Sequence, residues 1–94
     1  MSEKLSSQLK KAKQLLKIGD LISALAVVEE LKNKHDDVPD VWALDGEIAI
    51  RQQRIKDAMT AVDQAAKLEP DNAERHIQRA RCYIVAGDTD EALK

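Results

Sequence analysis

The chain has 94 residues, of which 44% are hydrophobic and 34% are charged, with a net charge of −2. This length suits one small domain, and the hydrophobic content excludes a compositionally disordered chain. Both charge signs are mixed along the whole chain, which argues against a nucleic-acid-binding protein, since that class needs concentrated positive charge. With three Gly, two Pro and no Phe, the chain favours long helices over strands.

Caps and breakers divide the chain into segments whose apolar residues recur at helical spacing. The first segment stops at Gly19, a residue that readily adopts the left-handed conformation, and Asp20 can cap the next one. Pro39 suits the first turn of a helix, and Pro70 ends one, because the residue before a proline avoids helical backbone angles. Gly87 and the aspartate after it repeat the first stop-and-cap pair. We therefore expect six helices, at about 3–18, 21–34, 39–52 and 55–68, a fifth that is capped by Asp71 or Asn72 and ends near 86, and a sixth from about 89.

Small residues fall on small residues when the chain is shifted by 34 positions. Two such series are Ala12, Gly46 and Ala80, and Ala24, Ala58 and Ala92. Two helices of a hairpin approach to about 8–10 Å only where the facing side chains are short. We therefore expect each pair of helices to nest, with Gly46 against Ala58.

The repeat carries a family signature in its middle copy. Residues 39–72 contain, at the family's spacing, Trp42, Gly46, Ala58, Val62, Ala65 and Pro70. In this respect the chain resembles the tetratricopeptide repeat family. The resemblance implies an all-α fold, a right-handed α-α superhelix of about two and two-thirds repeats, in a single domain over residues 1–94. The repeats would span 5–38, 39–72 and, in part, 73–94.

Two positions of the middle repeat need comment. Asp45 stands where the family has leucine, and we expect its side chain to point to the edge of the hairpin, with a looser core around it. Trp42 occupies a packing position of the family and is expected to act as a wedge between hairpins. The equivalent positions hold Gln8 and His76 in the other two repeats.

The resemblance also implies a non-enzymatic scaffold that binds a protein or peptide on its concave face, which the first helix of each repeat lines. The positions carried over to this chain are Leu9, Lys13, Leu16, Lys17, Ala43, Glu47, Ile50, Arg51, Ile77, Arg81 and Ile84. Their apolar members suit a helix or an extended peptide with apolar anchors and acidic flanks. The alternative is that the chain's own further residues or another subunit cover these apolar residues.

The residues that could in principle react or bind a metal do not form a catalytic or metal site. Cys82 is the only cysteine, so no intrachain disulfide is possible, and His76, six positions earlier on the same helix, lies on a different face. A buried structural role is therefore expected for Cys82. The cluster at 35–37 lacks a distant further ligand, so it predicts a solvated turn. We expect no enzyme activity, no cofactor and no metal.

The distribution of apolar residues bears on the cellular location of the protein. The N-terminus has no long apolar run, and no stretch approaches the roughly 20 apolar residues of a membrane span, so a cytoplasmic protein without a membrane partner is expected.

The last helix is cut short, which leaves apolar residues of the fifth helix without cover. Besides a peptide-binding adaptor, two alternatives stay open: homo-oligomerisation through the uncapped C-terminal helix, and an accessory domain in front of a longer protein such as a transferase.

Overall fold

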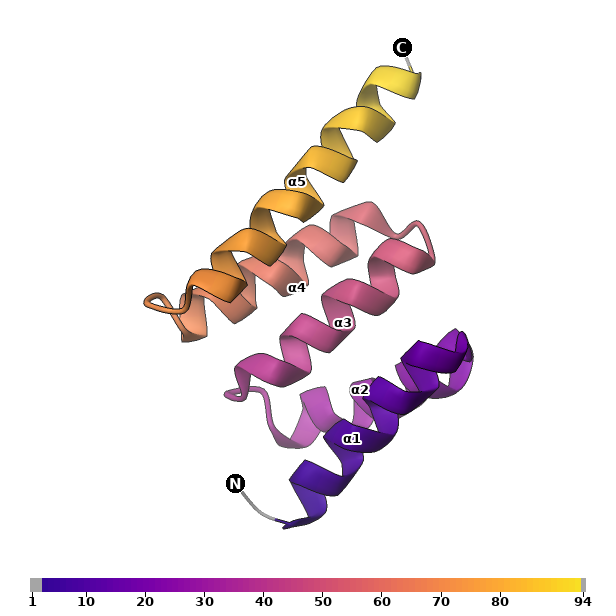
Figure 1. Cartoon of the computed structure of the whole chain (residues 1–94), viewed down its shortest axis with the longest axis vertical. Coiled ribbons are helices and arrows are strands. Elements are labelled where there is room, and N and C mark those ends of the chain that lie inside the picture. The colour runs from indigo at the N-terminus through magenta and orange to yellow at the C-terminus, as the bar shows by residue number, and fades with distance from the viewer. Residues whose placement is uncertain (1–2, 94) are drawn as a thin grey trace.

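The chain folds into a stack of helices. The computed structural model describes residues 3–93, with side chains as far as residue 87, and within that part it contains five helices and no strand. They are α1 (Glu3–Ile18), α2 (Leu21–Lys34), α3 (Pro39–Arg51), α4 (Ile55–Leu68) and α5 (Ala73–Leu93). The first pair lies at one end of the stack and α5 at the other, with α3 and α4 between them (Figure 1). The predicted all-α fold is confirmed.

The contacts between helices divide the stack into two sides. Each helix packs on the next one in the chain, and in addition α1 contacts α3 and α3 contacts α5, whereas α2 and α4 do not contact each other in the described part of the chain. The first helices of successive pairs therefore form a continuous layer. Any surface shared by several pairs lies on the side of α1, α3 and α5.

Short side chains let the helices of each pair nest, as the sequence predicts. Ala12 on α1 and Ala24 on α2 are fully buried, and so is Ala58 on α4. A Cβ atom placed on Gly46 of α3 would lie 2.7 Å from Cγ1 of Val62 and 3.6 Å from the carbonyl oxygen of Ala58. Only glycine therefore permits this approach of α3 to α4, and the predicted contact of Gly46 with Ala58 is confirmed.

The turn within each hairpin uses one residue of positive φ. Gly19 has φ 87°, and the Asp20 side chain that follows accepts a hydrogen bond from the backbone N–H of Ser23 (3.2 Å), so the predicted stop and cap are confirmed. At the equivalent place in the second hairpin, Gln53 has φ 61°. A non-glycine residue is uncommon in this conformation. The turn geometry is thus kept between repeats although the glycine is not.

The predicted break at Gly87 is wrong in this structure. Helix α5 continues through Gly87 to Leu93, and the expected sixth helix is absent from the described residues. A glycine inside a helix costs only about 1 kcal/mol relative to alanine. Helix α5 can therefore continue through Gly87 at little cost.

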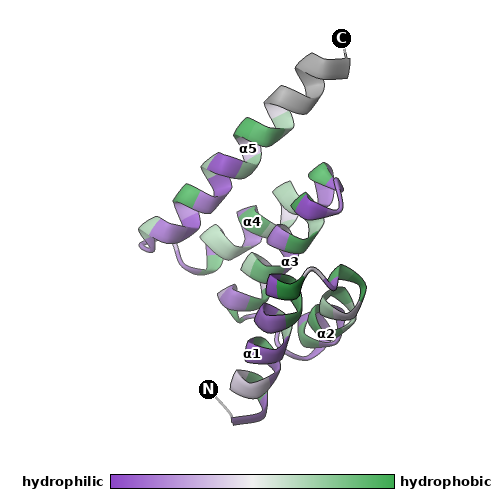
Figure 2. Ribbon diagram, turned by 45° about the vertical axis from the view of Figure 1, so that its right-hand side comes forward, coloured by the Kyte–Doolittle hydropathy of each residue, from purple (hydrophilic) through white to green (hydrophobic). Residues whose placement is uncertain are grey.

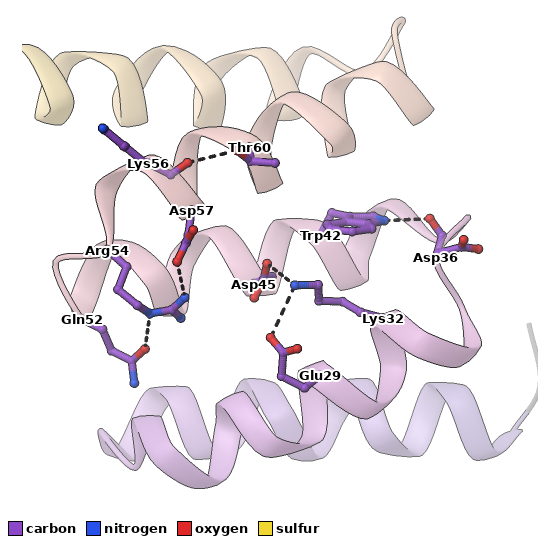
Figure 3. A network of polar contacts seen from close by, with 10 residues as sticks. All are labelled: Glu29, Lys32, Asp36, Trp42, Asp45, Gln52, Arg54, Lys56, Asp57 and Thr60. Carbon is purple, nitrogen blue, oxygen red and sulfur yellow. Dashed lines mark hydrogen bonds and ion pairs between the residues drawn. The ribbon is translucent and has the colours of Figure 1, made fainter.

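The expected placement of Asp45 at the hairpin edge is also wrong. Asp45 is only 4% exposed, and its Oδ2 lies 3.2 Å from Nζ of Lys32 on α2 (Figure 3). Lys32 also contacts Glu29 at 3.4 Å and lies 5.2 Å from the centre of the Trp42 ring. The long lysine side chain reaches into the α2–α3 contact and supplies the charge that the buried carboxylate needs. Burial nevertheless raises the pKa of Asp45, although Lys32 opposes the shift.

Polar contacts hold α5 and the α2–α3 loop in place. Asp63 on α4 accepts hydrogen bonds from Arg79 Nε (2.6 Å) and from the Tyr83 hydroxyl (2.8 Å). Trp42 Nε1 donates to the carbonyl oxygen of Asp36 in the loop (2.7 Å), as Figure 3 shows. Cys82 is fully buried between α5 and its neighbours, and burial raises the pKa of its thiol, so the predicted structural cysteine is confirmed.

Candidate functional site

A groove of about 520 Å³ lies on the side of the stack formed by the first helices. Its walls come from three helices that do not follow one another in the chain, α1, α3 and α5. The residues that line it are Lys13, Asp40, Ala43, Leu44, Glu47, Glu74, Arg75, Ile77, Gln78 and Arg81. Figure 2 shows hydrophilic and hydrophobic residues alternating along α5, which forms one wall.

Equivalent positions of the repeat recur within this groove. Ala43 and Ile77 are 34 residues apart, on α3 and α5, and form an apolar strip. Ile77 is 51% exposed, which leaves about half of its side-chain surface open to a ligand. Lys13, Glu47 and Arg81 follow the same 34-residue step on the three helices and are all exposed. The groove thus offers an apolar strip beside a row of charges.

The structure brings together only part of the predicted site. Lys13, Ala43, Glu47, Ile77 and Arg81 line the groove. The remaining predicted residues do not line it, and they are Leu9, Leu16, Lys17, Ile50, Arg51 and Ile84.

Packing explains why several predicted apolar positions do not reach the groove. Leu9 and Leu16 belong to the core between α1, α2 and α3 and are 4% and 5% exposed, so they present almost no surface to a partner. Ile50 is half-buried and packs against the cluster around Ala49 and Val62. Ile84 is well exposed but lies farther along α5. The apolar surface of the groove is therefore smaller than predicted.

Arg51 has a structural contact that the sequence did not suggest. Its Nη1 donates a hydrogen bond to the carbonyl oxygen of Leu16 in the last turn of α1 (2.9 Å). The last carbonyls of a helix carry partial negative charge, and the Leu16 carbonyl, which also accepts from the Gly19 N–H (3.1 Å), has a second lone pair for the guanidinium. Arg51 therefore ties the first hairpin to the second.

Three further polar contacts link α5 to α3 and to the end of α4. Gln78 Nε2 donates to the carbonyl oxygen of Ala43 (2.8 Å), and Arg75 is paired with Asp40 and with Glu69. Although burial opposes it, these acids raise the pKa of Arg75, and the hydrogen bond from Arg75 lowers the pKa of Glu69. Sequence reasoning did not single out Arg75. The spacing could have pointed to it, because Arg75 and Asp40 are 35 residues apart. The same separation joins Arg51 to Leu16 and Gln78 to Ala43.

The described side chains do not offer a metal site, since no three or more His, Cys, Asp or Glu residues come together among them. The described helices also include none with the length and apolar character needed to cross a bilayer. What the groove offers is hydrogen bonding, charge and a modest apolar strip.

Comparisons with known proteins bear on the C-terminal half. Residues 49–94 match a family model described as tetratricopeptide repeat, a stretch that includes the end of α3, all of α4 and the described part of α5. No curated protein and no solved structure matches the chain.

Proposed function

Because residues 49–94 match a model of the tetratricopeptide repeat, we propose that the chain is a non-catalytic scaffold that binds an extended peptide segment in the groove between α1, α3 and α5. The observation that carries the proposal is the convergence of three first helices on one groove. As part of the same proposal the protein acts in the cytoplasm, where a lone buried thiol such as Cys82 stays reduced.

The groove supports the proposal because polar contacts within the chain link its walls. Gln78 and Arg75 connect α5 to α3 through the contacts with Ala43 and Asp40. A preformed site avoids the loss of conformational freedom that a mobile surface undergoes on binding. Ile77 then provides an exposed apolar contact, and Lys13 and Arg81 provide charges at the rim.

Affinity capture with a groove variant tests this function. We expect the double variant Ile77→Asp with Arg81→Glu to lose the proteins that the parent chain captures from the native cell extract. A matched control, Ile22→Asp with Lys56→Glu, changes an exposed isoleucine and an exposed cation away from the groove and should retain them. Circular dichroism must show the same helical content for both variants. Equal loss in both, or retention in the groove variant, would refute the groove as the binding site.

Self-association is a second candidate, because α5 exposes Ile77, Tyr83 and Ile84. A two-fold contact through this face would bury them in a homodimer. Sedimentation equilibrium separates the two functions: Ile84→Asp, which lies outside the groove, should abolish a dimer but leave peptide binding intact. A parent chain that stays monomeric at high concentration would exclude this candidate.

A further inference from the structure

The charge row of the groove indicates which kind of peptide it takes. Lys13 on α1, Glu47 on α3 and Arg81 on α5 occupy equivalent positions of the repeat and line the same groove. Their signs alternate across the groove as positive, negative, positive. From this alternation, and resting on the proposed peptide-binding function, we infer that the partner is an extended segment with an acid, a base and an acid at every third residue.

The three charges are available to a ligand. No ion pair joins any of them to another side chain in the described part of the chain. Of the other charged residues in the groove, Asp40 and Arg75 are paired with each other. Glu74, the remaining acid, forms no ion pair with Arg81, from which it lies about 10.5 Å along α5.

The spacing of the row selects the backbone conformation of the partner. Helix α3 contacts both α1 and α5, and the axes of packed helices lie about 8–10 Å apart, so the backbone positions that carry the charges recur at roughly this step. A polyproline II segment has three residues per turn and rises about 3.1 Å per residue, so side chains at i, i+3 and i+6 share a face at steps of about 9.3 Å. Such a segment, lying across the three helices, presents one side chain to each charge.

The middle position of the row determines specificity. A peptide with three acids would be attracted by Lys13 and Arg81 but repelled by Glu47. Specificity of this kind arises from the repulsive contact as well as from the attractive ones. The apolar strip of Ala43 and Ile77 runs beside the row and can receive the side chains between the charged ones. The acidic partner expected from the sequence is thus refined to a partner of alternating charge.

Three labelled peptides test the inference with the full chain, by fluorescence anisotropy at low salt. The alternating probe is Glu-Leu-Pro-Lys-Leu-Pro-Glu, the uniform probe has glutamate in place of the lysine, and the inverse probe is Lys-Leu-Pro-Glu-Leu-Pro-Lys. We expect the alternating probe to bind about five-fold more tightly than the other two, as expected for exposed charge pairs. The preference should shrink as salt is added.

A charge reversal at Glu47 provides the decisive variant. Glu47→Lys makes the row uniformly positive, so the tightest ligand should change from the alternating to the uniform acidic probe. Asp37→Lys, on the exposed α2–α3 turn, makes the same change in net charge and should keep the parent preference. Equal affinity for all probes, or an unchanged preference in Glu47→Lys, would overturn the alternating-charge inference and leave groove binding intact. No binding of any probe would overturn both.

Discussion

Gly46 and Val62 lie so close that a Cβ atom on the glycine would come within 2.7 Å of Cγ1 of the valine. Val62 is fully buried and β-branched, so it cannot rotate out of the way. We predict that Gly46→Ala destabilises the fold by about 1–2 kcal/mol, because so short a contact places overpacking in the upper part of its range of about 1–3 kcal/mol, and this outweighs the about 1 kcal/mol of helix propensity gained. In a chain of this size the melting midpoint should fall by roughly 4–8 °C per kcal/mol.

Gly87→Ala is the matched control for this prediction. A Cβ atom there meets nothing within 4 Å, and α5 is continuous at this point. Alanine should therefore raise the melting midpoint, by the about 0.5–1 kcal/mol that separates the two residues in a helix. A lower midpoint for Gly87→Ala would show that this glycine ends a helix in solution. An unchanged midpoint for Gly46→Ala would show that α3 and α4 are not nested here.

The ion pair between Lys32 and Asp45 predicts opposite effects for a single and a double substitution. Lys32→Met leaves the buried carboxylate of Asp45 without its cation and should cost about 3 kcal/mol. Lys32→Met with Asp45→Leu replaces the pair by apolar side chains and should be at least as stable as the parent. Urea unfolding monitored by circular dichroism gives both values. A double variant as unstable as the single one would contradict this account of Asp45.

The raised pKa of Asp45 predicts how stability changes with pH. Burial raises this pKa above its ordinary value of 3.8, so the folded chain binds the proton more tightly than the unfolded chain. The resulting stabilisation is fully present below about pH 3.8 and is lost as the pH rises through the folded-state pKa. Relative to Asp45→Asn, the parent should therefore gain stability as the pH falls from about 7 to about 4. A difference between the two proteins that stays constant over this range would contradict the burial of the carboxylate.

Arg51 and Lys17 occupy equivalent repeat positions but differ in structure. The Arg51 side chain donates to the carbonyl oxygen of Leu16, whereas the Lys17 side chain forms no hydrogen bond or ion pair within the described part of the chain. We predict that Arg51→Met lowers the free energy of unfolding by about 1.5 kcal/mol, as expected for a hydrogen bond from a charged group. Lys17→Met should change it by less than about 0.5 kcal/mol. Similar effects of the two substitutions in chemical denaturation would show that Arg51 does not link the hairpins.

Much of the fold could be predicted from the sequence because it depends on local signals. The caps, the stops and the small residues at a 34-residue step fix the first four helices and the contact of Gly46 with Ala58. The continuation of α5 past Gly87 could not be predicted, because a glycine ends a helix only where another conformation is more favourable. The handedness of the superhelix and the repeat boundaries 5–38, 39–72 and 73–94 remain predictions.

The site was harder to predict because it depends on contacts between repeats. Helical periodicity places Leu9 and Leu16 on the apolar face of α1 but does not predict that α3 covers them. The pairing of Asp45 with Lys32 likewise depends on a lysine from the preceding repeat. Where the resemblance predicted exposed polar positions on the first helices, as for Lys13, Glu47 and Arg81, the structure places all three in one groove.

The most direct test of the central claim, that the first helices bind an extended peptide, is an NMR titration of the ¹⁵N-labelled chain with the alternating probe. The account predicts chemical-shift changes at the backbone amides of Lys13, Ala43, Glu47, Ile77 and Arg81, with little change along α2 and the outer face of α4. Shift changes concentrated on α2 and α4, or spread evenly over the chain, would contradict it.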